Sequence, residues 1–514
     1  MSISSIGNPL NPFAQTESQQ KAPPLNLDGD LDLGGMITKG PDGDSEPNRH
    51  PNPPMTNGKY RTTPEPITTM PSGVPFIIGN EAAERFSYYG MRSILVVFMT
   101  KFLVDANGHP DPMSNAVANQ WTHLFYAAVY WFPLLGSILA DVFIGRYLTI
   151  MSLSVVYCLG HLALALNDTR AGLLVGLTLI AIGAGGIKPC VSANVGDQFG
   201  STNKNLLTRV YIWFYFSINV GSAVAMYAIP AILYSPAIPK YFHMANAHLA
   251  FGLPGVLMLI ATIVFWMGRK KYVHVPPTGR NFFPETFANN GFRALAGLLP
   301  VYVVISVWWS LYDQCSTTWV EQAEKMDLHF LGKTWTPPEI QIWNPIFVLA
   351  YVPLFSYVIY PVAGRFFTVT PLRKMSVGLF FTVVCYLVGA WVEKLIGAGQ
   401  HPTMAWQVLA YAFLMASEIM VYATGLEFSY TQAPSNMKSM VMALYLATNS
   451  AGNLFTALVN HYIQNPDGKT VWLQGVPYYL FFSGLMFVAS IAFIFIAMFY
   501  KGKSYLPDTK AVAA

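Results

Sequence analysis

The chain has 514 residues, of which 53% are hydrophobic, 14% aromatic and only 11% charged. This composition excludes an ordinary soluble globular protein and indicates a polytopic membrane protein. The net charge of +4 does not indicate a nucleic-acid partner, because the basic residues follow the connections between apolar segments.

Residues 1–70 are rich in Pro, Asn, Gly, Asp and Thr and contain no signal-peptide core, which predicts a disordered cytosolic tail. Twelve apolar segments long enough to span a bilayer follow. Their approximate ranges are 74–103, 119–141, 147–166, 171–195, 206–234, 248–268, 294–320, 342–364, 375–396, 404–427, 438–463 and 476–500. The sequence therefore predicts an all-α polytopic membrane protein with two six-helix bundles, at 71–268 and 294–500. A cytosolic connection at 269–293 joins the bundles, and a short cytosolic tail at 501–514 ends the chain.

Basic residues are concentrated on one side of this arrangement. Most of the 30 Lys and Arg residues lie in the first tail, after the even-numbered segments and after the last segment. Positive charge marks cytosolic connections. We therefore expect a multi-pass protein of the plasma (cytoplasmic) membrane with both termini in the cytosol.

A short motif recurs at the same inner turn of each half. Gly-x-x-x-x-Asp-x-x-x-Gly-Arg occupies 136–146, and a shorter Gly-Arg echo occupies 364–365. The echo predicts pseudo-symmetric halves related by an axis along the membrane normal. The first copy resembles a loop signature of the major facilitator superfamily. We expect Asp141 and Arg146 to pair with neighbouring helix ends, a structural and conformational role.

The first segment carries charges in its interior, where each ionised side chain costs roughly 2.5 to 3.5 kcal/mol on the insertion scale. At about 100° per residue, five polar residues form one stripe about 100° wide. They are Glu81, Glu84, Arg85, Tyr88 and Arg92. The stripe must face other helices or a wet cavity. An ion pair that only locks helix packing is the plainer alternative, but so many polar groups exceed what packing requires.

The run Glu-Ala-Ala-Glu-Arg-Phe-Ser-Tyr-Tyr-Gly at 81–90 resembles the first-helix signature of the proton-dependent oligopeptide transporters (POT/PTR family), a branch of the major facilitator superfamily. The resemblance extends over about residues 74–500 and implies the major facilitator fold. In that family the glutamates and the arginine imply proton coupling and binding of the substrate carboxylate. The residues assigned in this way are Glu81, Glu84 and Arg85 for proton coupling, and Arg85, Tyr88 and Tyr89 for substrate binding.

Further polar residues lie in the first half. Lys188 precedes a proline deep in an apolar segment, so it must find an anion or give up its proton. We expect a salt bridge to Glu81 or Glu84 that works as a switch, and the resemblance adds binding of the peptide carboxylate. His123 and Tyr130 are seven residues apart and share a helix face. Resemblance to the animal branch implies proton movement at His123, against the alternative of a packing partner, and we assign Tyr130 to the substrate site.

The remaining substrate contacts follow from the resemblance. Asn219 lies in a run similar to the family's second signature, although such an asparagine is often only an interhelical hydrogen bond. The run at 425–439, just after Glu418, closely resembles eukaryotic members. By this resemblance Glu418 would hold the peptide ammonium and Trp309 would line a side-chain pocket. Asn219 and Asn344 would contact the peptide backbone.

Arg92 and Asp313 are candidates for an outer gate. Arg92 lies about 10 Å nearer the outside than Arg85, on the same face, and Asp313 is the only acid well inside 294–320. These segments begin the two halves, so their outer ends should meet when the outside closes, with a static bridge or no contact as the alternative. Some family members carry the acid one position later, where this chain has Gln314.

Three other departures concern size. The loop at 397–403 is short where animal relatives have a large external domain, and the connection between the halves is too short for the two extra helices of many bacterial relatives. Tyr445 stands where a tryptophan is typical, which leaves the size of that pocket open.

The charges inside the membrane suggest what is carried. Three bases face four acids, which leaves −1; one proton neutralises the site, and a zwitterionic peptide leaves it neutral. We therefore expect a proton-coupled symporter that imports di- and tripeptides by alternating access. The alternatives are a transporter of nitrate or another small anion on the same scaffold, and a peptide sensor.

The proton gradient is the expected driving force, because the chain has no Walker A loop. No enzyme is predicted, because the chain has no His-Glu-x-x-His and no paired catalytic aspartates. The four widely spaced cysteines predict neither disulfides nor a metal site. We expect no cofactor. The expected partners are di- and tripeptides, protons and the lipid bilayer, without nucleic acid.

Overall fold

The computed structural model describes residues 60–203, 206–237, 246–277, 279, 291–432, 438–463 and 473–500. The predicted N-terminal tail up to residue 59, the C-terminal tail at 501–514, and residues 278 and 280–290 of the predicted connection at 269–293 lie outside these residues. The described regular structure is helical apart from isolated bridges and one hairpin. In this hairpin, β1 (His329–Phe330) pairs with β2 (Lys333–Thr334) in antiparallel register.

The described residues of the first half contain six long helices, two of which continue into short irregular turns. They are α1 (Val74–Lys101), α2 (Asn115–Ile138) with the π-helical turn η1 (Leu139–Ile144), α3 (Arg146–Leu166), α4 (Arg170–Asp197), α5 (Leu207–Leu233), and α7 (Asn246–Met267) with the 3₁₀ turn η3 (Gly268–Lys270).

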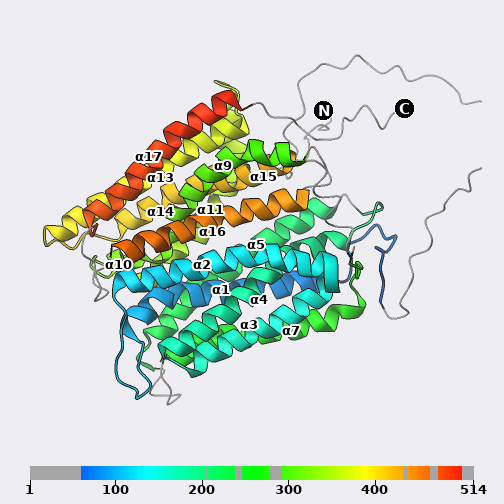
Figure 1. Ribbon diagram of the computed structural model, residues 1–514, viewed down its shortest axis with the longest axis horizontal. Coiled ribbons are helices and arrows are strands. Elements are labelled where there is room, and N and C mark those ends of the chain that lie inside the picture. Colours follow the sequence, from blue (N-terminus) through cyan, green and yellow to red (C-terminus); the bar gives the residue numbers. More distant parts are fainter. Residues whose placement is uncertain are drawn as a thin grey trace, which may run out of the picture.

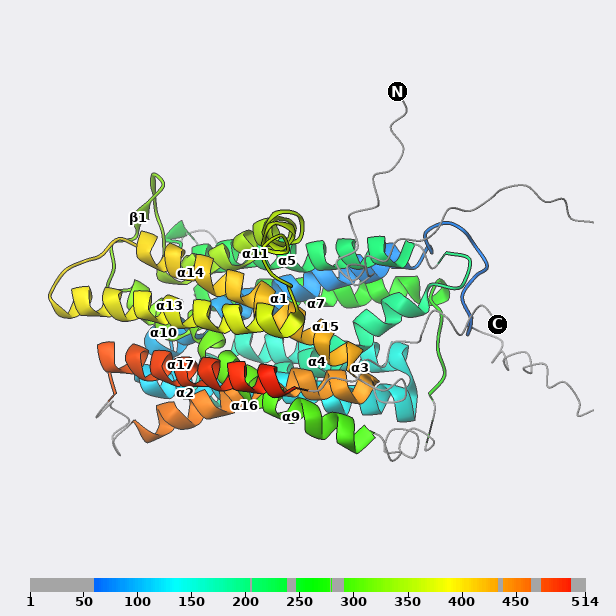
Figure 2. The same cartoon turned by 90° about the horizontal axis from the view of Figure 1, so that it is seen from above.

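The second half repeats this organisation with more interrupted helices. Its elements are α9 (Gly291–Tyr312), the 3₁₀ turn η5 (Asp313–Ser316), α10 (Thr318–Ala323), the 3₁₀ turn η6 (Pro337–Ile342), α11 (Trp343–Leu354), the π-helical turn η7 (Phe355–Ile359), α12 (Tyr360–Ala363), α13 (Pro371–Gly397), α14 (Ala405–Glu418), the π-helical turn η8 (Ile419–Ala423), α15 (Thr424–Thr431), α16 (Lys438–Tyr462) and α17 (Val476–Phe499). Figures 1 and 2 show the helices running along one axis, and the halves meet where α2 packs on α16 and α5 on α11.

The fold is that of an all-α polytopic membrane protein, as predicted. Ten of the spans in the described part of the chain are long and apolar enough to cross a membrane. Helices α1 and α16 are equally long but more polar: α1 carries the charged stripe, and α16 carries three asparagines. The number of twelve spans therefore stays a prediction that rests on these two helices.

Apolar side chains divide between the interior and the outer surface of the bundle. Buried apolar residues form two clusters, one mainly in the first half and one mainly in the second. Large apolar side chains are exposed at positions 488, 491, 495 and 498 of α17, which lie on one helix face. An apolar outer face is what contact with lipid requires.

The motif at 136–146 links helix ends, as its sequence led us to expect. Nη1 of Arg146 lies 2.6 Å from Oδ1 of Asp197 at the end of α4, and Nη2 lies 3.5 Å from Asp141. Gly145, with φ +79, adopts the left-handed conformation that lets the chain turn from η1 into α3. This cluster ties α2, α3 and α4 together at one end of the bundle.

Gly136 allows α2 to approach α4 closely, which generates a stability prediction. A Cβ at position 136 would overlap the backbone oxygen of Gly186, and backbone cannot move aside as a flexible side chain can. We expect Gly136→Ala to destabilise the protein by about 1 to 3 kcal/mol, measured as a lower midpoint of thermal unfolding in detergent. Gly484→Ala in α17 is the control, because a Cβ there meets nothing within 4 Å. Equal midpoints for the two variants would contradict the close approach.

Candidate functional site

The charged stripe of α1 forms a compact ion cluster inside the first half. Nε of Arg85 lies 2.7 Å from Oε1 of Glu81 and 2.9 Å from Oε2 of Glu84. Both glutamates are almost completely buried, at 2% and 1% exposure. Glu81 lies one helical turn before Arg85 and Glu84 directly precedes it, so a single guanidinium reaches two carboxylates.

Lys188 does not form the salt bridge that we expected. Its ammonium lies 4.0 Å from the ring centroid of Tyr130 and 4.6 Å from that of Tyr88. Within the described part of the chain, both stripe glutamates pair with Arg85 instead. The planar guanidinium can reach two carboxylates at once, and a cation facing aromatic rings is stabilised without an anion. The expected bridge to either glutamate is therefore wrong for this conformation.

The second half presents an acidic group within a ring of aromatic side chains. Tyr312 donates a hydrogen bond of 2.7 Å to Oε2 of Glu418, and Nδ2 of Asn344 donates to the Tyr312 hydroxyl at 3.0 Å. Trp309 packs against Tyr312, with ring centroids 5.1 Å apart, and against Tyr422 at 5.3 Å. Glu418 and Asn344 keep part of their surface exposed.

The basic and acidic groups face the same region between the halves. Tyr89 of α1 interacts electrostatically with both Arg85 and Glu418, and so does Tyr422 of η8. The rings of Tyr130 and Trp309 also approach across the halves, with centroids 6.1 Å apart. We define the two poles as the Arg85 cluster with Lys188 in the first half, and Glu418 with its hydrogen-bond partners in the second.

Asn219 forms a hydrogen bond within its own helix. Its Nδ2 donates to the backbone oxygen of Tyr215 at 2.9 Å, one turn earlier in α5, and the residue is 7% exposed. The structure thus shows an intrahelical hydrogen bond, and the predicted contact with substrate stays a prediction.

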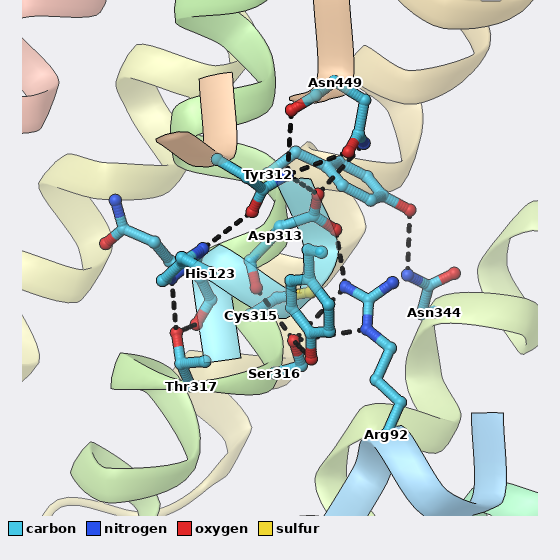
Figure 3. Close-up of polar contacts among 12 residues, drawn as sticks. Arg92, His123, Tyr312, Asp313, Cys315, Ser316, Thr317, Asn344 and Asn449 are labelled. Atoms are coloured by element: carbon cyan, nitrogen blue, oxygen red, sulfur yellow. Dashed lines mark hydrogen bonds and ion pairs between the residues drawn. The ribbon is translucent and has the colours of Figure 1, made fainter. Parts of the chain in front are cut away.

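A second polar cluster joins the halves farther along α1. Arg92 places Nη2 2.5 Å from Oδ1 of Asp313 and 3.2 Å from the Ser316 hydroxyl, as Figure 3 shows. The guanidinium also lies over the ring of Tyr126, 4.2 Å from its centroid. His123 belongs to this cluster, separate from the Arg85 ion pairs: its Nε2 lies 3.2 Å from the Thr317 hydroxyl (Figure 3).

Several members of this cluster were missed in the sequence. Asn449 and Asn453 of α16 both donate to Oδ2 of Asp313, at 3.0 and 2.7 Å. Asn453 also accepts from Nδ1 of His123 at 2.7 Å. A signal was present: two asparagines four residues apart share a face of a membrane-length helix, and such polar groups usually have partners. Tyr312, the partner of Glu418, gave no comparable signal.

The halves are also held together at the end of the bundle where α1 finishes, the predicted outer side. Nζ of Lys101 lies 2.7 Å from Oε1 of Glu324. Gln341 donates to the backbone oxygen of Ser93 at 2.8 Å. Together with the Arg92–Asp313 pair, these contacts join the halves at this end of the protein.

Comparison with known families places the chain. A family model described as the POT family matches residues 147–292 and 289–473. The chain is 34% identical over 372 residues to peptide transporter family 1 of Drosophila melanogaster, covering 64% of this chain and 48% of that protein. It is 34% identical over 402 residues to solute carrier family 15 member 2 of Mus musculus, covering 70% and 53%. The chain spans about half the length of these curated relatives.

Solved structures agree with this placement. A crystal structure of the POT family transporter PepTSo superposes with a TM-score of 0.75 at 32% identity, covering 84% of this chain and 99% of that chain. An auto-inhibited POT family peptide transporter superposes with a TM-score of 0.75 at 34% identity, covering 85% and 99%.

Charge reversal tests whether the Arg92–Asp313 pair holds the outer end closed. Removing one partner of a buried pair costs about 3 to 5 kcal/mol, so Arg92→Asp and Asp313→Arg should each open this end. We expect spin labels at the exposed positions 107 and 400 to move apart in either variant. The double swap should restore only part of the short distance, because an arginine at 313 would meet two amide donors.

Arg170→Asp is the matched control, because Arg170 pairs with Asp111 within the first half, at 2.6 Å. Reversing that charge should leave the label distance unchanged. If the label distance in the double swap is no shorter than in the more open single variant, the Arg92–Asp313 pair does not act as a gate.

Proposed function

This chain belongs to the POT family of transporters, and from that premise we propose that it is a proton-coupled symporter that imports di- and tripeptides by alternating access. It would work in the plasma membrane with both termini in the cytosol, without a cofactor and without enzymatic activity. The observation that carries the proposal is the pairing of a basic pole in one half with an acidic pole in the other.

The two poles match the two ends of a peptide. A free peptide carries an ammonium and a carboxylate separated by a short backbone, and a ligand that contacts both poles would draw the halves together. In this proposal Glu418 holds the ammonium, while Arg85 and Lys188 hold the carboxylate. Tyr88, Tyr89, Tyr130, Asn219, Trp309 and Asn344 complete the substrate contacts. Nitrate or another small anion fits less well, because Glu418 would repel it.

The Arg85 cluster supports a mechanism for coupling. While Glu81 and Glu84 are ionised, they occupy the guanidinium that the peptide carboxylate needs. A proton on either glutamate weakens its hold on Arg85, because a neutral carboxyl makes weaker hydrogen bonds than a carboxylate. Lys188 interacts electrostatically with Glu84 without a direct salt bridge to it, so a proton on Glu84 would also release Lys188 for an incoming anion. Protonation and peptide binding would therefore favour each other.

The second polar cluster, which we call the outer cluster because it lies on the predicted outer side, would control opening and closing of that side. In the proposed cycle this conformation is closed on the outer side by Arg92, Asp313 and the contacts beyond them. We assign His123, which lies in the same cluster, to proton movement from that side. Opening of the outer end must break the Arg92–Asp313 pair, and closure must restore it.

Uptake of labelled dipeptide into proteoliposomes, with and without an inward proton gradient, tests the proposal as a whole. We expect accumulation only with the gradient. Equal, unconcentrated uptake under both conditions by folded protein would overturn it.

Glu418→Gln tests the ammonium site. The glutamine keeps the shape of the side chain but loses its charge, and a charge-assisted contact is worth roughly 1.5 to 3 kcal/mol. Dipeptide affinity should fall about 10- to 150-fold, measured by equilibrium binding to the purified protein. N-acetylated dipeptides should bind the unmutated protein about as poorly.

Glu427→Gln provides a matched control, because Glu427 lies on the next helical segment, α15, outside the proposed poles. It should bind dipeptide normally. If acetylation leaves binding unchanged, Glu418 does not hold the ammonium.

Glu84→Gln tests coupling. A permanently neutral side chain cannot release and take up a proton, so proton-driven accumulation should be lost. Peptide counterflow should remain largely intact, because it requires no net proton movement. Both are measured as labelled uptake into proteoliposomes. Equal loss of both would instead give Glu84 a role in binding or folding.

A further inference from the structure

Asn453 contacts two titratable residues of the outer cluster, His123 and Asp313. Its Oδ1 lies 2.7 Å from Nδ1 of His123, on the first half, and its Nδ2 lies 2.7 Å from Oδ2 of Asp313, on the second. His123, Asn453 and Asn449 are fully buried, and Asp313 is 1% exposed. No bulk water competes with these bonds, so their direction matters.

The surroundings of Asn453 fix the orientation of its amide. Nδ2 faces three acceptors: the Asp313 carboxylate, the backbone oxygen of Asn449 at 3.0 Å and the side-chain oxygen of Asn449 at 2.8 Å. A flipped amide would direct its oxygen at all three and lose every bond. The oxygen must therefore face His123, and Nδ1 of His123 must carry a hydrogen.

This orientation leaves Nε2 of His123 as the position that gains or loses a proton. Its partner is the Thr317 hydroxyl at 3.2 Å, which can donate to the neutral ring or accept from the charged one. The charged groups near His123 are Arg92 of α1 and Asp313 of η5. Tyr126 lies beside it on the same helix, with ring centroids 5.8 Å apart.

We propose that Asn453 is a positioning residue that couples protonation of His123 to the Arg92–Asp313 pair, an inference that rests on the proposed function. A positive ring strengthens the bond from Nδ1 to Oδ1 of Asn453. It also polarises the amide so that Nδ2 donates more strongly to Asp313. Protonation thereby gives Asp313 a second source of positive potential and weakens its dependence on Arg92.

Asn449 offers a matched comparison. It donates to the same oxygen of Asp313 from the same helix, at 3.0 Å, but the structure gives it no bond to His123. Asn449→Leu and Asn453→Leu should each remove a donor from Asp313 with little change in side-chain size. Only Asn453→Leu also removes the acceptor of His123.

The experiment measures the pH midpoint of outer opening, with spin labels at positions 107 and 400 of the full chain, and repeats the titration on proton-driven dipeptide uptake. Asn453→Leu should move both midpoints to lower pH by roughly half to one unit, the difference between a charge-assisted and a neutral hydrogen bond. Asn453→Asp, which places a negative acceptor beside the ring, should move them to higher pH. Asn449→Leu should change the amplitude of outer opening and of uptake but leave both pH midpoints unchanged.

The inference is overturned if Asn449→Leu shifts the midpoints as far as Asn453→Leu does, or if the leucine and aspartate variants at 453 shift them in the same direction. Its failure is distinct from failure of the proposed function. If the unmutated protein carries no dipeptide, the label distances still respond to pH and still separate the variants.

Discussion

The organisation of this protein depends on the free energy of placing ionised side chains inside a membrane. A buried charge without a partner is destabilising by several kcal/mol, so every charge in the interior requires an arrangement of its neighbours. Arg85 meets this requirement by holding Glu81 and Glu84 together on one face of α1. Lys188 meets it with the faces of two tyrosine rings. The helices around α1 must be placed so that these groups never face lipid.

The interior separates into two polar clusters with different connections. The Arg85 cluster is made within α1, so it can change protonation without moving a helix. The Arg92 cluster is made between the halves, because Asp313, Asn449 and Asn453 belong to the second half. A change of charge in the second cluster therefore acts directly on the contact between the halves. This difference provides a physical basis for separating substrate binding from gating in the proposed cycle.

Two irregular turns of the second half, η5 and η8, are located at its buried polar groups. Helix α9 ends in the 3₁₀ turn η5, which carries Asp313 and Ser316 toward Arg92. The π-helical turn η8 follows Glu418 directly and carries Tyr422. Such turns leave regular hydrogen bonding only where neighbouring helices can satisfy the backbone. The turns η5 and η8 lie at the two places where the second half contributes to the polar clusters.

The sequence by itself determined the fold class and the faces that matter. Apolar segment length predicts the helices, and the fixed rotation of about 100° per residue places Glu81, Glu84 and Arg85 on one stripe. The expected symmetry of the halves also led us to expect Arg92 near Asp313, because the first helices of two related halves end on the same side. The tertiary structure alone decided the partners of Lys188 and His123. Lys188 faces rings instead of a carboxylate, and His123 joins Asp313 through Asn453, because distances between helices depend on side-chain packing that no single helix encodes.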